Sequence, residues 1–165
     1  MPDRCMAGKT YRKEAGFTLI ETAVTLMVIG IFSALVTVSY LRYAAHWDLV
    51  TAARVLASDI RETRDQAIQG GEGADLWFYK GWGYYERRSS TGQVCEEVYL
   101  PKRVMFDSFN GFQEVKGLPA GTPVYKLHFK FTGNPGSTGT VYLKNTVGES
   151  RKVVIAVTTG RVRVE

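Results

Sequence analysis

The stretch GFTLIETAVTLMVIGIFSALVTVSYL, residues 16–41, decides how this chain is organised. From Phe17 to Leu41 there is no Lys, Arg, Asp or Pro, and the single acidic residue is Glu21. A helix rises about 1.5 Å per residue, so this segment would span roughly 37 Å, enough to cross a bilayer core of about 30 Å. The sequence therefore predicts a transmembrane helix over residues 17–41.

A basic leader precedes this apolar segment. Residues 1–16 hold four basic and two acidic residues, in a chain with a net charge of +5. Basic flanks stay cytoplasmic, so we expect the leader in the cytoplasm and the C-terminal domain outside the inner membrane. A secretory signal peptide fits less well, because its apolar core is shorter and a small-residue cleavage site follows it. A lipoprotein signal also fits poorly, because neither Cys5 nor Cys95 follows an apolar stretch.

The helical pattern continues beyond the apolar segment. Between Gly30 and Gly70 there is neither Gly nor Pro. Apolar residues recur every three or four positions, at Leu49, Ala52, Ala53, Leu56, Ile60, Ala67 and Ile68. This spacing predicts one helix over residues 17–69, transmembrane in its first half and amphipathic in its second. The pair Gly70-Gly71 is expected to end the helix, since glycine tolerates a positive φ.

The carboxylate of Glu21 requires an explanation, because a charge inside a membrane costs a few kcal/mol and usually has a partner. Cleavage between Gly16 and Phe17 would create an α-amino group one helical turn away. In a stack of such helices, Glu21 of one subunit could pair with this amine of its neighbour and fix their axial register. The alternative is an interfacial glutamate near the helix end that has no role in assembly.

The segment KEAGFTLIETAVTLMVIGIFSALV, residues 13–36, resembles the class III signal of type IV pilins and type II secretion pseudopilins. The resemblance implies that prepilin peptidase cleaves after Gly16 and methylates Phe17, and that Glu21 is the assembly residue. It implies other pilins or pseudopilins and the inner membrane as further partners. Many pilins have a proline midway through this helix, where Val38 stands here, and its absence fits minor subunits at least as well as major ones.

Short β-type runs separated by turn residues follow Gly73. We predict strands over residues 75–80, 83–89, 95–100, 104–109, 125–132, 139–145, 152–158 and 161–165. In the fifth run, Leu127, Phe129 and Phe131 are expected to face one side of the sheet. Residues 133–139 and 145–150 are interpreted as hairpin loops, and residues 158–160 as a tight turn.

These runs predict an antiparallel β domain, residues 70–165, packed on the amphipathic half of the helix, an α+β arrangement like that of type IV pilins. The stretches FKFTGNPGSTGTVYLKN, residues 129–145, and SRKVVIAVTTGRVRVE, residues 150–165, resemble the C-terminal hairpins of the GspH/FimT family. That resemblance implies a long N-terminal helix with two small β-sheets. It covers about residues 14–70 and 125–165.

The ending TTGRVRVE is the best candidate for a binding site. Gly160 would occupy the turn, and alternation would place Arg161 and Arg163 on one face, about 7 Å apart, with Val162 and Val164 packed inward. Two guanidinium groups at this spacing suit successive phosphates of DNA.

Three further basic residues, Lys144, Arg151 and Lys152, lie on neighbouring predicted hairpins and could widen the basic patch. The pattern G-R-x-R also resembles the motif by which FimT-type minor pilins bind DNA, which implies DNA contact by Gly160, Arg161 and Arg163. The alternative is that charges on an edge strand discourage sheet-to-sheet aggregation.

Nothing in the sequence favours an enzyme or a cofactor. The two histidines, His46 and His128, belong to different predicted elements, and neither a Cys/His cluster with metal-ligand spacing nor a P-loop occurs.

If the leader is removed, Cys95 is left alone, and we expect it to be a half-buried strand residue. The aromatic residues Trp77, Phe78, Trp82, Tyr84 and Tyr85 are expected mainly in the core, with stacking on single-stranded bases as the alternative.

Two functions therefore remain open. The first is a type IV pilus minor pilin that takes up DNA during natural transformation. The second is a minor pseudopilin of a type II secretion system that contacts other pseudopilins or exported proteins. They share residues 17–69 and differ in the use of the basic C-terminus.

Overall fold

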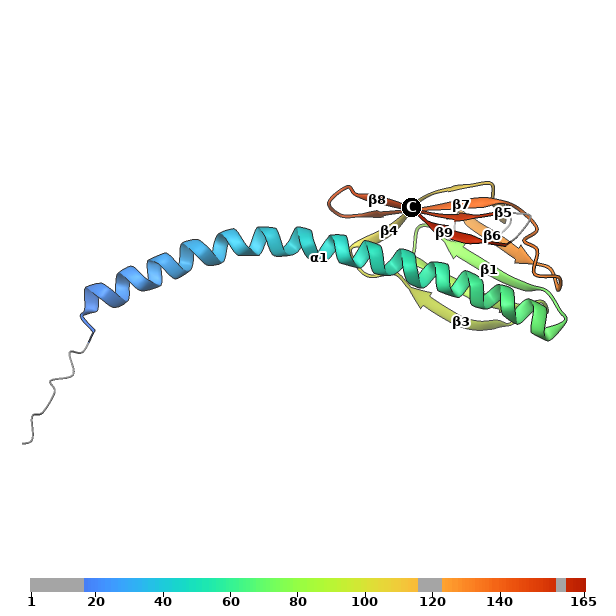
Figure 1. The fold of residues 1–165 in the computed structure, drawn as a ribbon, viewed down its shortest axis with the longest axis horizontal. Coiled ribbons are helices and arrows are strands. Elements are labelled where there is room, and N and C mark those ends of the chain that lie inside the picture. The colour runs from blue at the N-terminus through green and yellow to red at the C-terminus, as the bar shows by residue number, and fades with distance from the viewer. Residues whose placement is uncertain (1–16, 116–122, 157–159) are drawn as a thin grey trace, which may run out of the picture. The chain divides into compact units, whose positions relative to one another are not determined.

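The computed structural model describes residues 17–115, 123–156 and 160–165 (Figure 1). The chain forms two compact units, which divide between Ser39 and Tyr40. The predicted cleavage residue Gly16 and most of the predicted turn at residues 158–160 lie outside the described residues.

The predicted long helix is confirmed as α1, Leu19–Gly70. Gly71, with φ of +65°, follows its last residue, as the Gly-Gly pair predicts. By length and composition, α1 contains one candidate membrane span, whose 18-residue window has a mean hydropathy of 2.2. None of this window is buried within the structure.

Nine described strands form two antiparallel sheets. They are β1 (Ala74–Tyr79), β2 (Tyr84–Ser89), β3 (Val94–Tyr99), β4 (Val104–Asn110), β5 (Gln113–Val115), β6 (Val124–Phe129), β7 (Gly139–Asn145), β8 (Ser150–Ile155) and β9 (Val162–Val164). The larger sheet has the order β3-β2-β1-β6-β5, and the smaller has the order β4-β7-β8-β9. The α+β class is confirmed, with two sheets as the family resemblance implies.

Each of the eight predicted strands overlaps one observed strand, and β5 was not predicted. Two expectations about the β6 region were wrong. First, β6 ends at Phe129, so Phe131 is 62% exposed. Second, residues 133–139 do not close a hairpin between neighbouring strands, because β6 and β7 belong to different sheets. The chain turns back after Phe129, forms one bridge to it from Pro135, and then crosses to the smaller sheet.

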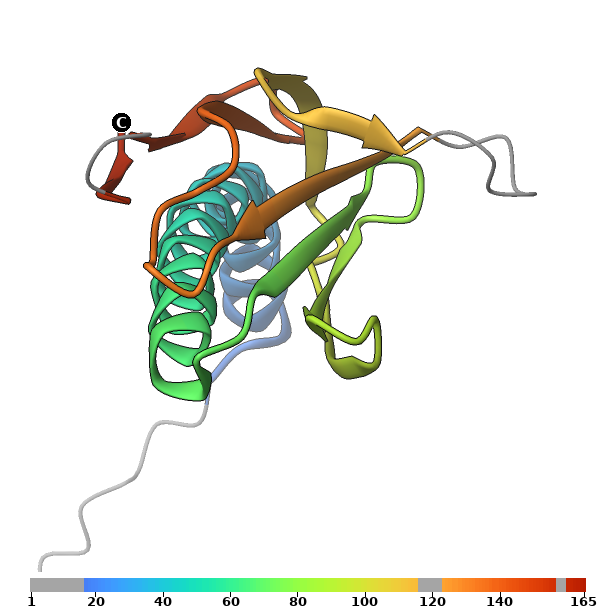
Figure 2. The same ribbon diagram turned by 90° about the vertical axis from the view of Figure 1, so that its right-hand side faces the viewer.

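The core lies between the second half of α1 and the inner faces of both sheets (Figure 2). Its largest fully buried side chains are Leu49, Leu56 and Ile60 of α1, Leu76, Phe78, Tyr85, Leu127 and Phe129 of the larger sheet, and Val141, Leu143 and Ile155 of the smaller. Burial of each such side chain contributes about 1.5–3 kcal/mol. The predicted apolar helix face is confirmed except at Ile68, which is 44% exposed.

Buried polar contacts join α1 to β2. The hydroxyl of Tyr85 donates to the carboxylate of Asp59, and burial raises the pKa of both groups. Arg87, whose side chain is 9% exposed, forms ion pairs of 2.8 Å with Glu62 and 3.1 Å with Glu96. Because both carboxylates are about half exposed, the guanidinium bears most of the cost of desolvation in this cluster.

Cys95 is exposed, contrary to the expectation of a half-buried residue. It lies on the edge strand β3, at an irregularity where Arg87 pairs with Glu96 and Arg88 pairs with Val94. Cys95 is thus the extra residue of a β-bulge, which removes it from the ladder, and it is exposed like most residues of this edge strand.

Candidate assembly site and basic surface

The candidate assembly site lies at the start of α1. Thr18 caps the helix, since the Glu21 N–H donates to Thr18 Oγ1 at 3.3 Å. Phe17 is 80% exposed and Glu21 is also exposed in the first turn. No cation pairs with Glu21 among the residues that the structure describes. The cap was not predicted, although the T-x-x-E pattern of residues 18–21 is a capping-box signal.

The outer face of the smaller sheet carries part of the predicted basic patch. Arg163 of β9 is paired with Val154, and Lys152 of β8 is paired with Tyr142. Directly paired residues share a face and alternate residues along a strand do too, so Arg163, Lys152 and Lys144 lie on one face. Arg161, two residues before Arg163, is exposed at the same edge.

The prediction that Val162 and Val164 pack inward is confirmed for Val162, which is buried. It is wrong for Val164, which is 37% exposed. Arg151 does not join the patch on this face. It is paired with Leu143, whose side chain is fully buried, so Arg151 lies on the inner face of the smaller sheet.

An acidic residue also interrupts the patch. Glu165 pairs with Lys152 at 2.8 Å, and its pKa is lowered by this hydrogen bond and by the charge of Lys152. The charge of Arg163 lowers the pKa of Glu165 further. The face is therefore less cationic than its count of basic residues suggests.

Gly160 has a packing role in this structure. It is buried, with φ of +60°, and a Cβ placed there would lie 2.7 Å from Arg64 Nε and 3.1 Å from the Gly133 carbonyl oxygen. Arg64 Nε donates to that carbonyl at 3.0 Å, and Arg61 donates to the Val162 carbonyl at 3.0 Å. Two arginines of α1 thus hold β9 and the loop after β6 against the helix.

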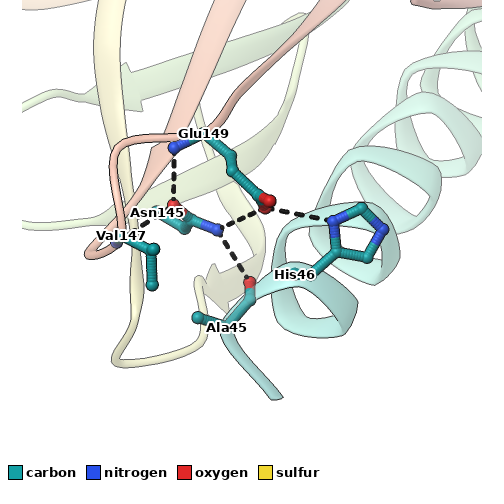
Figure 3. A network of polar contacts seen from close by, with 5 residues as sticks. All are labelled: Ala45, His46, Asn145, Val147 and Glu149. Carbon is teal, nitrogen blue, oxygen red and sulfur yellow. Dashed lines mark hydrogen bonds and ion pairs between the residues drawn. The ribbon is translucent and has the colours of Figure 1, made fainter. Parts of the chain in front are cut away.

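A polar network ties the β7–β8 hairpin to α1 (Figure 3). Asn145, which is 2% exposed, donates to the Ala45 carbonyl at 3.2 Å and to Glu149 Oε2 at 2.9 Å. Its own side-chain oxygen accepts from the N–H groups of Val147 and Glu149. His46 Nδ1 lies 3.0 Å from Glu149 Oε2, and this hydrogen bond is the main cause that lowers the pKa of Glu149.

The predicted hairpin loop at residues 145–150 is confirmed, but the role of Asn145 was not predicted. An asparagine at the start of a Gly-containing hairpin is a signal for side-chain bonds to the turn backbone. The contact to Ala45, one hundred positions away, has no local signal.

The expectation that most of the five aromatic residues singled out by sequence lie in the core was wrong, because only Phe78 and Tyr85 are buried there. Tyr84 stacks between Tyr79 and Tyr99 on the outer face of the larger sheet, with ring centroids 4.5 and 5.3 Å apart. Trp77 lies under Arg88, whose guanidinium carbon is 4.1 Å from the ring centroid. Trp82 is 63% exposed in the β1–β2 turn.

Comparison with known proteins supports the interpretation of the N-terminal segment. Residues 11–37 match the family model of the prokaryotic N-terminal methylation motif. No curated protein sequence matches the chain at a significant level.

Solved structures identify the fold. The chain is similar to the minor pseudopilin EpsH from the type 2 secretion system of Vibrio cholerae, with a TM-score of 0.55 and 14% identity. The similarity covers 72% of this chain and 96% of that one. A second structure of the same pseudopilin gives a TM-score of 0.54 and 13% identity, covering 71% of this chain and 92% of that one.

The N-terminal motif and the fold occur in one chain and agree with each other. The motif covers the start of the chain, and the pseudopilin fold covers most of it. Together they support the predicted family: the chain carries an N-terminal methylation motif and has the fold of the minor pseudopilin EpsH.

Proposed function

We propose that the chain is a minor pseudopilin, a structural subunit of a type II secretion filament. The observation that carries this proposal is the occurrence of the methylation motif, residues 11–37, in a chain with the fold of a secretion pseudopilin. Of the two functions that the sequence left open, this is the second.

In this proposal, residues 17–41 anchor the subunit in the inner membrane, with the leader in the cytoplasm and the β domain outside. Prepilin peptidase cleaves after Gly16 and methylates Phe17. The carboxylate of Glu21 then pairs with the terminal amine of a neighbouring subunit. This pairing is supported by the exposure of Glu21 at the capped start of α1, where a neighbour can reach it.

Processing is the direct test. Co-expression with a prepilin peptidase, followed by mass spectrometry of the N-terminus, should find a chain that begins at Phe17 and carries one added methyl group. Gly16→Val should keep its leader, because a bulky residue before the scissile bond blocks cleavage. Normal processing of Gly16→Val would contradict the peptidase assignment.

DNA capture is a second candidate, favoured by one observation, the exposure of Arg161 and Arg163 at the same edge of the smaller sheet. Nothing in the comparisons supports DNA binding, and Glu165 reduces the charge of this face. The test is titration of the chain with short duplex DNA at two salt concentrations, beside an Arg161→Ala/Arg163→Ala variant. Binding that weakens with salt and is lost in the variant would support DNA capture, because phosphate contacts release counterions. Absence of binding by both proteins would leave the secretion function alone.

A further inference from the structure

An exposed aromatic stripe follows the apolar segment of α1. Tyr40, Tyr43 and Trp47 are 64%, 61% and 46% exposed, and their spacing of three and four residues places them on one side of the helix. The rings of Tyr43 and Trp47 are in contact, with centroids 5.9 Å apart. The residues that pack on the sheets, such as Ala45 and Leu49, lie on the opposite side. Tyr and Trp are enriched where membrane helices leave the bilayer.

A second exposed apolar group lies on the other side of the same helical turns. Val147, at the tip of the β7–β8 hairpin, is 48% exposed. The hydrogen bond from Asn145 to the Ala45 carbonyl holds this hairpin against α1 (Figure 3). Ala45 lies between Tyr43 and Trp47 in the sequence, so the hairpin meets the helix at the turns that carry the aromatic stripe. The Val147 N–H donates to Asn145 at 3.1 Å, so the network that ties the hairpin to α1 also fixes its tip.

Basic residues adjoin the hairpin tip. The Thr146 N–H donates to the Arg103 carbonyl at 3.0 Å, and the neighbouring Lys102 is exposed. Of the acidic residues nearby, Asp48 pairs with Arg103 at 3.1 Å, and Glu149 is hydrogen-bonded to His46 at 3.0 Å. This combination of exposed apolar groups and an exposed lysine suits an anionic lipid surface.

We propose that this end of the unit Tyr40–Glu165 contacts phospholipid headgroups, through the aromatic stripe on one side of α1 and through Val147 and Lys102 on the other. A bilayer surface surrounds a helix that leaves it, so it covers both sides at once. A neighbouring helix would cover the aromatic stripe alone and leave Val147 in water. The inference rests on the proposed membrane anchoring of α1, and it adds that the folded domain lies directly on the membrane before assembly.

The experiment uses the full chain in vesicles of phosphatidylethanolamine and phosphatidylglycerol. Spin labels are attached to single cysteines in a Cys5→Ser/Cys95→Ser background, at Val147→Cys, Thr91→Cys and Leu26→Cys. Thr91 is the matched control, because it is exposed in a hairpin loop that Ser90 joins to Glu72, beyond the other end of the helix. Leu26, which is 68% exposed in the apolar segment, reports on membrane insertion. Collisions with oxygen and with a water-soluble nickel chelate measure the surroundings of each label.

The label at position 147 is expected to be protected from nickel and accessible to oxygen, and the label at position 91 to be fully accessible to nickel. This protection should persist when the number of proteins per vesicle is lowered. If position 147 is as accessible to nickel as position 91 while position 26 is in lipid, the inference is wrong and the membrane anchor stands. If protection at position 147 disappears on dilution, a second copy covers the surface and the inference is also wrong. If position 26 itself is accessible to nickel, the proposed anchoring fails and this inference fails with it.

Discussion

Arg64 and Gly160 lie so close together that no Cβ fits at position 160 without moving the arginine. A Cβ there would lie 2.7 Å from Arg64 Nε and 3.0 Å from Arg64 Cδ. The same Nε donates to the Gly133 carbonyl, so the glycine lets one helix residue hold two loops. The glycine of the G-R-x-R pattern therefore has a structural reason that is independent of any ligand.

Gly160→Ala should destabilise the domain more than Gly83→Ala. Gly83 has φ of +64° and nothing within 4 Å of its added Cβ, so alanine there meets only the left-handed strain of about 1–2 kcal/mol. Alanine at Gly160 meets the same strain and also displaces Arg64 from the Gly133 carbonyl, which adds about 1 kcal/mol. Urea unfolding in detergent micelles, followed by tryptophan fluorescence, measures the free energy of unfolding of both variants. Equal decreases in this free energy would contradict the packing role of Gly160.

The Arg87 cluster should respond asymmetrically to substitution. Burial by itself lowers the pKa of Arg87, but the hydrogen bond and charge of Glu62 and the charge of Glu96 outweigh it and raise the pKa. A Glu62→Gln/Glu96→Gln variant removes both ion-pair partners of the buried guanidinium and leaves only the more distant charge of Asp59, so the domain should lose about 2 kcal/mol of stability. Arg87→Met leaves only half-exposed carboxylates, which water solvates, and should change stability by about 1 kcal/mol or less. A larger loss in Arg87→Met than in the double variant would refute this account.

The polar network of the β7–β8 hairpin, through the Glu149 carboxylate, should stabilise the domain at neutral pH but not at acidic pH. The pKa of Glu149 is lowered from its ordinary value of 4.5, so the folded state favours the carboxylate. The stabilisation is therefore present above the unfolded pKa and is lost as the pH falls through the folded pKa. Wild type should be more stable than Glu149→Gln at neutral pH, and the difference should disappear well below pH 4.5. Urea unfolding across this pH range measures the difference, and a constant gap at all pH values would contradict the prediction.

If the proposed function is right, Glu21→Ala should be cleaved normally but assemble poorly, because it removes the carboxylate proposed to fix the register and leaves the proposed cleavage site intact. Thr22→Ala is the matched control, since Thr22 is an exposed neighbour whose hydroxyl bonds only to the Leu19 carbonyl of its own helix. Filament yield after co-expression with partner pseudopilins, measured beside the N-terminal mass, separates the two steps. Wild-type filament yield in Glu21→Ala would remove the register role.

The elements whose signals are local could be predicted from the sequence. The helix Leu19–Gly70 follows from apolar spacing and from the absence of Gly and Pro between residues 30 and 70. The strand β7, Gly139–Asn145, was predicted with the observed bounds because turn residues flank an alternating run. The same reasoning extended β6 to residue 132, since periodicity does not reveal where a strand loses its partner.

The pairing of distant segments was decided by the tertiary structure alone. Sequence pattern could not show that β6 and β7 enter different sheets, or that Arg151 faces inward beside Leu143, because register depends on which strands meet. It could not explain Gly160 either, since Arg64 approaches it from a helix almost one hundred residues earlier. The sequence by itself determined the membrane-length helix and the methylation motif of residues 11–37, which contains Gly16, Phe17 and Glu21, because an apolar run and a contiguous motif depend only on neighbouring residues. Three features were decided by contacts that form only when the chain folds. They are the set of basic residues on the outer face of the smaller sheet, the close packing of Gly160 on Arg64, and the hydrogen bonds of Asn145.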